Sequence, residues 1–125
     1  MPHNTSRDVL TGRIIRCCFD VHNKLGPGFI EKIYHQALII ALQEALLKTE
    51  TEKIFPVFFN EKKIGCGRLD LVIENSVILE IKAVTGHMPQ LFQYQLLSYL
   101  KSSGIKTGLL INFGNKSCEI KRLSV

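Results

Sequence analysis

The sequence contains no long apolar segment and no recognisable export signal. Apolar runs such as 38–42 and 109–113 fall far short of the roughly 18 residues that a membrane-spanning helix needs. The N-terminal residues Met-Pro-His-Asn-Thr-Ser lack the charged and then apolar pattern of a signal peptide. We therefore expect a cytoplasmic protein that has no membrane partner.

Cysteines spaced to hold zinc are also lacking. The four cysteines, Cys17, Cys18, Cys66 and Cys118, include no C-x-x-C pair. Adjacent Cys17 and Cys18 point in different directions on a helix, so buried, reduced thiols are expected rather than a metal or disulfide framework. Repeats, linkers and low-complexity segments are absent as well. The 125 residues therefore predict one domain, 1–125, with residues 1–6 frayed.

The chain carries a modest excess of positive charge. Sixteen basic and eleven acidic residues give a net charge of +5. The excess is spread thinly, with Lys62-Lys63 and Lys121-Arg122 as the only basic doublets. This charge is compatible with a polyanionic partner but does not identify one.

The apolar pattern predicts three helices and five short strands. Residues recurring at three- and four-residue steps predict helices over 7–25, 29–47 and 88–103. Short Val-, Ile-, Leu- and Phe-rich runs predict strands over 54–59, 64–73, 77–83, 107–113 and 118–125. Residues 48–53 are predicted to be a connector. The order ααβββαββ predicts an α/β (α+β) fold in which a mixed β-sheet is flanked by helices.

Three charged residues interrupt the apolar strands 64–73 and 77–83. Glu80 and Lys82 share one face of their strand, and a hairpin through Asn75-Ser76 would bring Asp70 near Glu80. Paired carboxylates suit Mg²⁺ or Mn²⁺, and a lysine beside them could neutralise phosphate charge or position a water. An ordinary salt bridge between Lys82 and either acid is the alternative interpretation.

Two helical pairs accompany these charges. Glu31 and Tyr34 are neighbours at the start of the second predicted helix, and Gln95 and Tyr99 share a face of the third. Glu31 has a simpler interpretation too, because an acidic residue in a first turn complements the helix dipole.

Together these motifs resemble the PD-(D/E)XK nuclease superfamily, whose restriction-endonuclease-like core is α-β-β-β-α-β. Within it, the chain is similar to the small bacterial and archaeal proteins of the GxxExxY family, matched by Gly28, Glu31 and Tyr34. The resemblance runs from about Leu10 to Leu123. Its further blocks are Leu25-Gly26-Pro27, Asp70-Leu71, Glu80-Ile81-Lys82-Ala83, Gln95-Leu96-Leu97-Ser98-Tyr99-Leu100 and Gly108-Leu109-Leu110-Ile111-Asn112-Phe113-Gly114.

The resemblance implies a metal-dependent nuclease that hydrolyses DNA or RNA phosphodiester bonds. It implies that Mg²⁺ (or Mn²⁺) is bound by Asp70, Glu80 and the Ile81 carbonyl, and that Lys82 is the catalytic lysine. Glu31 matches an acid that many members bring close to the metal. The residues expected to support the site or contact substrate are Gln95, Tyr99, Tyr34 and Gly28.

Two other functions fit the same sequence. The site could serve a catalytically silent nucleic-acid- or protein-binding module. The chain could also be an interaction protein whose contact edge is the strand with Phe55, Phe58 and Phe59. A domain this small has limited surface for a duplex unless it forms a homodimer or joins a larger assembly.

Overall fold

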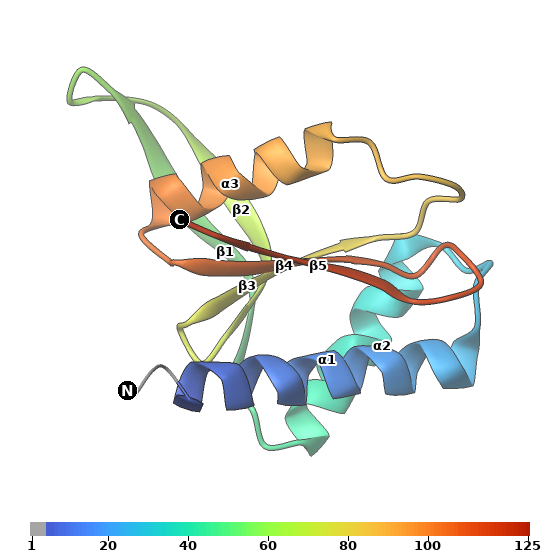
Figure 1. Ribbon diagram of the computed structural model, residues 1–125. Helices are drawn as coiled ribbons and strands as arrows, with labels where there is room; N and C mark the ends of the chain where they lie inside the picture. Colours follow the sequence, from blue (N-terminus) through green and yellow to red (C-terminus); the bar gives the residue numbers. More distant parts are fainter. Residues whose placement is uncertain (1–4) are drawn as a thin grey trace.

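A computed structural model describes residues 5–125 of the chain. It contains the predicted helices and strands in the predicted order (Figure 1). The elements are α1 (Thr5–Leu25), α2 (Glu31–Glu44), β1 (Thr49–Phe59), β2 (Lys62–Ile73), β3 (Val77–Lys82), α3 (Leu91–Ser103), β4 (Thr107–Asn112) and β5 (Glu119–Ser124). The fraying predicted for residues 1–6 falls mainly on residues 1–4, outside the described part, and α1 already includes Thr5. In residues 5–125, no helix is long and apolar enough to cross a membrane.

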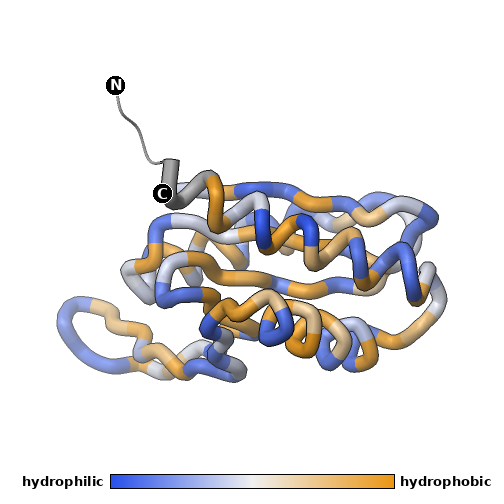
Figure 2. Tube along the Cα trace, turned by 90° about the horizontal axis from the view of Figure 1, so that it is seen from below, coloured by the Kyte–Doolittle hydropathy of each residue, from blue (hydrophilic) through white to orange (hydrophobic). Residues whose placement is uncertain are grey.

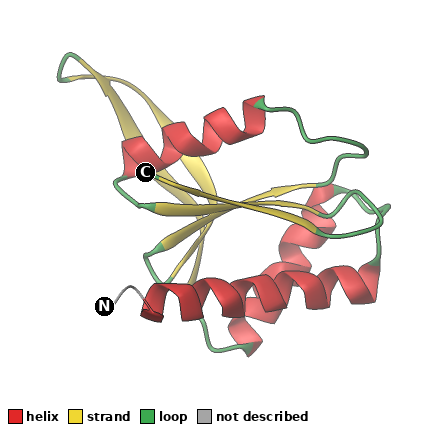
Figure 3. Ribbon diagram, in the orientation of Figure 1, coloured by secondary structure: helices red, strands yellow, loops and turns green. Residues whose placement is uncertain are grey.

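The five strands form one mixed sheet in the order β1-β2-β3-β4-β5. The first three strands make the predicted antiparallel meander, β4 is parallel to β3, and β5 is antiparallel to β4. Every residue of β4 is buried, as expected for a strand covered on both faces. The crossover from β3 to β4 contains α3, which covers one face of the sheet, while α1 and α2 cover the other (Figure 3).

Two apolar cores hold these layers together, one on each face of the sheet. The larger core joins α1 and α2 to the sheet and is centred on Ile14, Leu38, Leu79 and Ile111. The smaller core lies under α3 and includes Leu96, Leu100, Ile78 and Leu110. Alternate residues of β3 and β4 supply both cores, so any polar residue in β3 must face one of the helical layers.

The connector predicted over 48–53 is wrong, because β1 begins at Thr49. Residues 49–53 are polar and largely solvent-exposed, yet Thr49, Glu50 and Thr51 pair with β2. Ladder hydrogen bonds involve only the backbone, so an edge strand can continue through a polar segment that has no apolar pattern.

The second helix is shorter than the predicted range 29–47. Gly28 has φ of 114°, which keeps the chain non-helical up to the cap at Ile30. At the other end, Leu46 has φ of 62° and terminates the helix. The third helix likewise begins at Leu91 rather than at Met88.

Candidate functional site

The predicted site residues of β2 and β3 lie where these two strands separate. Backbone pairing of β2 with β3 stops at Leu71 and Leu79, one residue before Asp70 and Glu80. Beyond that point, Asp70 Oδ2 accepts a hydrogen bond from the Ile81 backbone N–H at 3.1 Å. A carboxylate therefore takes the place of the next ladder bond, and both acids lie together beneath α3.

The Ile81 carbonyl faces the same gap. The N–H and C=O of one strand residue point toward the same neighbouring strand, so the Ile81 carbonyl points to the side of Asp70. The next residue points the other way, because the Lys82 carbonyl accepts a hydrogen bond from Phe113 of the segment after β4 at 2.9 Å. Two carboxylates and one carbonyl thus lie near the point where β2 and β3 separate, and oxygen donors of this kind suit a hard cation.

Glu80 is the most unusual residue of the site. Its side chain is only 7% exposed, and its Oε1 atom has no hydrogen-bond partner. Burial raises the pKa of the Glu80 carboxyl to about 9, the negative charge of Asp70 acts in the same direction, and the charge of Lys82 opposes them. A buried acceptor without a hydrogen-bond partner is costly, so Glu80 lowers the stability of the fold as it stands.

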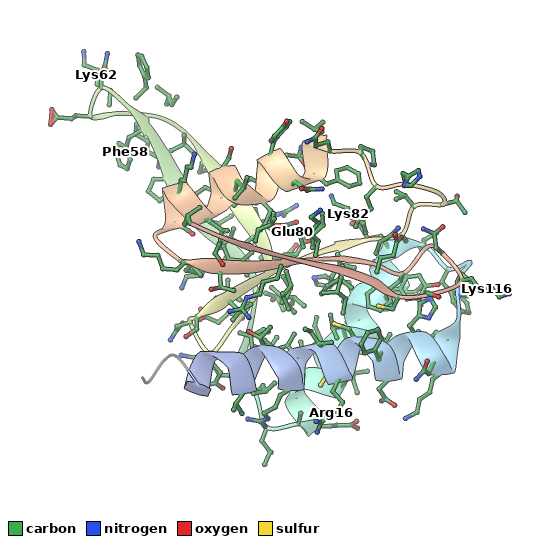
Figure 4. All side chains as sticks on the ribbon, viewed as in Figure 1. Arg16, Phe58, Lys62, Glu80, Lys82 and Lys116 are labelled. Atoms are coloured by element: carbon green, nitrogen blue, oxygen red, sulfur yellow. The ribbon has the colours of Figure 1, made fainter. Side chains whose placement is uncertain are left out.

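Lys82 extends from β3 toward α3, as Figure 4 shows beside Glu80. Its Nζ atom lies 4.4 Å from the centroid of the Phe92 ring, a cation–π geometry. Lys82 forms no ion pair with a described side chain, so the alternative salt bridge with Asp70 or Glu80 is not formed. No spacing rule in the sequence links Phe92 to Lys82, and we did not predict this contact.

Glu31 lies at the margin of the site. It is the first residue of α2, whose N-terminal turn lies beside the end of β3 (Figure 1). Burial raises the pKa of Glu31, the charge of Lys82 opposes this, and the charge of Asp70 adds to it. The described residues contain no group of three or more His, Cys, Asp or Glu side chains that could hold a metal. Asp70 and Glu80 are therefore a pair, with Glu31 farther out.

Gly28 and Tyr34 do not enter the site but fix the loop that leads to Glu31. The Tyr34 hydroxyl donates to the Gly26 carbonyl at 2.5 Å and accepts from the Phe29 N–H at 3.2 Å. The Tyr34 ring is fully buried and stacks on Phe113, with centroids 4.8 Å apart. The Gly-x-x-Glu-x-x-Tyr motif therefore contains three residues with different roles. Gly28 has a positive φ, Glu31 lies at the margin of the site, and the Tyr34 hydroxyl binds two backbone groups of the loop.

The two α3 residues of the predicted set differ in their positions. Tyr99 is half-buried. Burial is the main cause that raises the pKa of its phenol, and the negative charges of Glu80 and Asp70 act in the same direction. Tyr99 thus lies near both acids. Gln95 is exposed on the preceding turn of α3, and in the described part of the chain it makes no hydrogen bond to the acids or to Lys82.

The segment after Lys82 is held by two asparagines that we did not predict. Asn112 donates to the Val84 carbonyl and accepts from the Val84 N–H, both at 2.9 Å. Asn115 makes the same pair of bonds with Gly86, both at 2.8 Å. The two amides thus replace backbone partners and hold residues 84–86, which follow β3. From the sequence we predict only a tight turn at Gly114-Asn115.

The sequence profile of the PD-(D/E)XK nuclease superfamily matches residues 8–123, nearly the whole chain. The chain belongs to this superfamily. The fold agrees with that of SSO0001, whose crystal structure superposes with a TM-score of 0.62 over 74% of this chain and 48% of that chain, at 23% sequence identity. This chain thus spans about half the length of SSO0001. No curated protein matches it.

Membership of the PD-(D/E)XK nuclease superfamily confirms the predicted α/β fold with a restriction-endonuclease-like core. Most members of the superfamily are metal-dependent nucleases, typically with Mg²⁺, and their substrates are nucleic acids.

Proposed function

We propose that this chain is a divalent-metal-dependent nuclease that hydrolyses the phosphodiester bonds of DNA or RNA. The observation that carries the proposal is the buried, unpartnered Oε1 of Glu80 beside Asp70. A protein that had kept only the fold would gain by replacing such a carboxyl with an apolar residue. The Gly28, Glu31 and Tyr34 spacing further supports membership of the GxxExxY family within the superfamily.

The residues present fit Mg²⁺ or Mn²⁺. The Asp70 and Glu80 carboxylates and the Ile81 carbonyl would hold the ion, and its charge would satisfy Glu80. When bound, the ion supplies a Lewis acid that binds a phosphate oxygen and lowers the pKa of a water.

Lys82 provides a fixed positive charge next to the two acids. The Phe92 ring holds its ammonium on the α3 side, where it can meet the charge that develops on an attacked phosphate. Glu31, at the margin, would bind a water next to the two acids. We assign Tyr99 and Gln95 to contacts with the substrate strand, because they lie on the α3 face that borders the site.

Residues 1–125 are proposed to form one nuclease domain that works in the cytoplasm. The cysteines support this compartment, because none of the four forms a disulfide: Cys17 and Cys18 are buried, Cys118 is half-buried and Cys66 is exposed. Free thiols of this kind are usual in a reducing environment.

Calorimetric titration with Mn²⁺ tests the metal site. We expect a binding heat in the wild type, its loss in Asp70→Ala, and an unchanged heat in the control Glu44→Ala, whose side chain is exposed on α2. A wild type without any metal-dependent heat would refute the proposal.

Cleavage of labelled single- and double-stranded DNA and RNA tests the chemistry. Lys82→Ala should bind Mn²⁺ like the wild type but cleave roughly 10²- to 10³-fold more slowly, the usual cost of losing one electrostatic contact to the transition state. Metal binding by the wild type without cleavage of any of these substrates would instead identify a silent binding module.

A further inference from the structure

The β1–β2 hairpin extends well beyond the rest of the sheet (Figures 1 and 3). The two strands pair from Thr49 and Ile73 as far as Phe59 and Lys62, whereas β3 pairs with β2 over only three residues, beginning at Leu71. Residues 53–68 therefore form a two-stranded projection, here called the arm. No third strand of the described chain pairs with it.

The base of the arm is packed rather than loose. Phe55 is buried, so the predicted contact edge of Phe55, Phe58 and Phe59 is wrong for this residue. Its ring contacts Tyr99 edge-on at 5.5 Å and covers the backbone of Gly67, where a Cβ would collide with it. The arm thus leaves the sheet in a fixed direction, next to the site residue Tyr99.

The tip of the arm combines exposed aromatic rings with unpaired cations. Phe58 is 59% exposed and lies opposite Lys63, and Phe59 is 65% exposed and lies opposite Lys62. Successive strand residues face opposite sides, so each face of the tip presents one phenylalanine beside one lysine. Figure 2 shows the hydrophilic turn between two apolar stretches. Among the described residues, neither lysine forms an ion pair.

This arrangement does not suit a flat protein partner. Such a partner would cover one face of the arm and leave the aromatic ring of the other face in water. A second copy meeting the arm tip to tip would bring Lys62 and Lys63 against their own equivalents, and like charges repel. Lys53 and Arg68 at the base of the arm pair with Glu50 and Glu52, which leaves Lys62 and Lys63 at the tip beside the single acid Glu61. This small positive excess favours an anionic partner.

Unpaired nucleotides can contact the phenylalanine and the lysine on both faces of the arm tip. Their bases have exposed aromatic surfaces that stack on phenylalanine, and their phosphates attract lysine, whereas a duplex keeps its bases stacked on one another. We propose that the arm binds the single-stranded part of a nucleic-acid substrate, with Phe58 and Phe59 on bases and Lys62 and Lys63 on phosphates. This inference rests on the proposed nuclease function, because the bound strand is the substrate of the same site.

The geometry also sets a substrate length. β1 runs from Phe55, which contacts Tyr99, to Phe59 at the tip, with a register shift between Val57 and Phe58 on the way. Lys62 precedes Asp70 by eight residues of β2, which at about 3.3 Å per residue is roughly 26 Å. A strand stacked at about 3.4 Å per nucleotide covers that distance with roughly eight nucleotides.

Fluorescence anisotropy with labelled oligonucleotides in EDTA tests the arm without cleavage. Wild-type affinity should rise sharply between strands of about 5 and about 10 nucleotides and should exceed that for a blunt duplex. Phe58→Ala/Phe59→Ala should weaken binding of a 20-nucleotide strand at least tenfold. Lys62→Ala/Lys63→Ala should reduce the slope of log affinity against log salt by about 1.4, from about 0.7 per phosphate contact.

Two control variants match these changes at other places. Lys116→Ala removes an exposed lysine at the opposite end of the molecule (Figure 4), and Phe19→Ala removes an exposed phenylalanine on α1. Both should bind like the wild type. All substituted side chains are exposed, and circular dichroism verifies that each variant is folded.

Arm variants that bind the 20-nucleotide strand like the wild type would overturn the inference, as would affinity that does not depend on strand length. A change of sedimentation in Phe58→Ala/Phe59→Ala with unchanged oligonucleotide binding would assign the arm to a second copy, which also overturns it. Arm-dependent binding by a wild type that never cleaves would refute the nuclease function alone. Cleavage with arm-independent binding would refute the arm alone.

Discussion

At the scale of single residues, the contact of Lys82 with an aromatic ring decides how the two acids can act. An ammonium paired with Asp70 or Glu80 would compete with a metal ion for their oxygens. The Phe92 ring attracts the same ammonium without using a carboxylate. The acids therefore stay available. The lysine stays close enough to oppose the rise that burial causes in the pKa values of Glu80 and Glu31.

Replacing Phe92 should change Lys82 without changing metal binding. Protons held above an aromatic ring resonate upfield, so the Lys82 Hε signals should lie upfield in the wild type and return to ordinary positions in Phe92→Leu. Loss of the contact, about 0.5–1 kcal/mol, should slow cleavage roughly two- to fivefold at unchanged Mn²⁺ affinity. Phe92→Tyr should behave like the wild type. The control Phe19→Leu replaces an exposed phenylalanine of α1 and should leave the Lys82 signals and the cleavage rate unchanged. Identical Lys82 spectra in wild type and Phe92→Leu would contradict the contact.

At the scale of elements, the loop between α1 and α2 is the device that brings Glu31 to the sheet. Gly26 and Gly28 have φ of 69° and 114°, values that favour glycine. The sharp turn that they allow places α2 under the end of β3. The Tyr34 hydroxyl then ties α2 back to the loop through two backbone groups.

Removing that hydroxyl should loosen the loop while keeping the ring packing. In Tyr34→Phe the Gly26 carbonyl and Phe29 N–H lose their partner, and we expect the free energy of unfolding to fall by about 1–2 kcal/mol. Urea unfolding followed by circular dichroism measures it. The control is Tyr94→Phe, because Tyr94 is 56% exposed and should change stability by less than about 0.5 kcal/mol. Equal losses in the two variants would show that the loop does not depend on Tyr34.

At the scale of the whole molecule, Glu80 couples folding to pH. The ordinary pKa of its carboxyl is 4.5, and in the folded protein burial, with Asp70, raises it to about 9. Between these values the folded protein keeps a proton that the unfolded chain has released. In the absence of metal, the free energy of unfolding should therefore fall as the pH rises through this interval.

Glu80→Gln should remove this dependence, because its amide stays neutral. At pH 8 in EDTA we expect the variant to be more stable than the wild type by roughly 4 kcal/mol, and at pH 5 the two should be similar. Saturating Mn²⁺ should stabilise the wild type at pH 8 but not the variant. Urea unfolding at both pH values measures these differences, with Glu44→Gln as the exposed control. Parallel pH dependence in wild type and Glu80→Gln would contradict the assignment.

Much of the fold could be predicted from local pattern. The eight elements and the antiparallel meander follow from apolar periodicity and turn residues, which act within a few positions of the chain. The start of β1 could not be predicted in this way. Thr49 and its polar neighbours pair through backbone hydrogen bonds, which do not depend on the side-chain pattern. Phe55 and Phe58 looked alike in sequence, and α3 buries one and not the other.

The amino-acid sequence by itself determined which chemical groups are available: two carboxylates and a lysine set into apolar strands, at a spacing that one hairpin brings together. Only the tertiary structure decided their states. Whether Glu80 is buried without a partner, whether Lys82 meets an acid or the Phe92 ring, and how far Glu31 stands from the pair depend on how α2 and α3 pack on the sheet. Packing joins residues far apart in the chain, and such contacts have no local pattern from which to predict them.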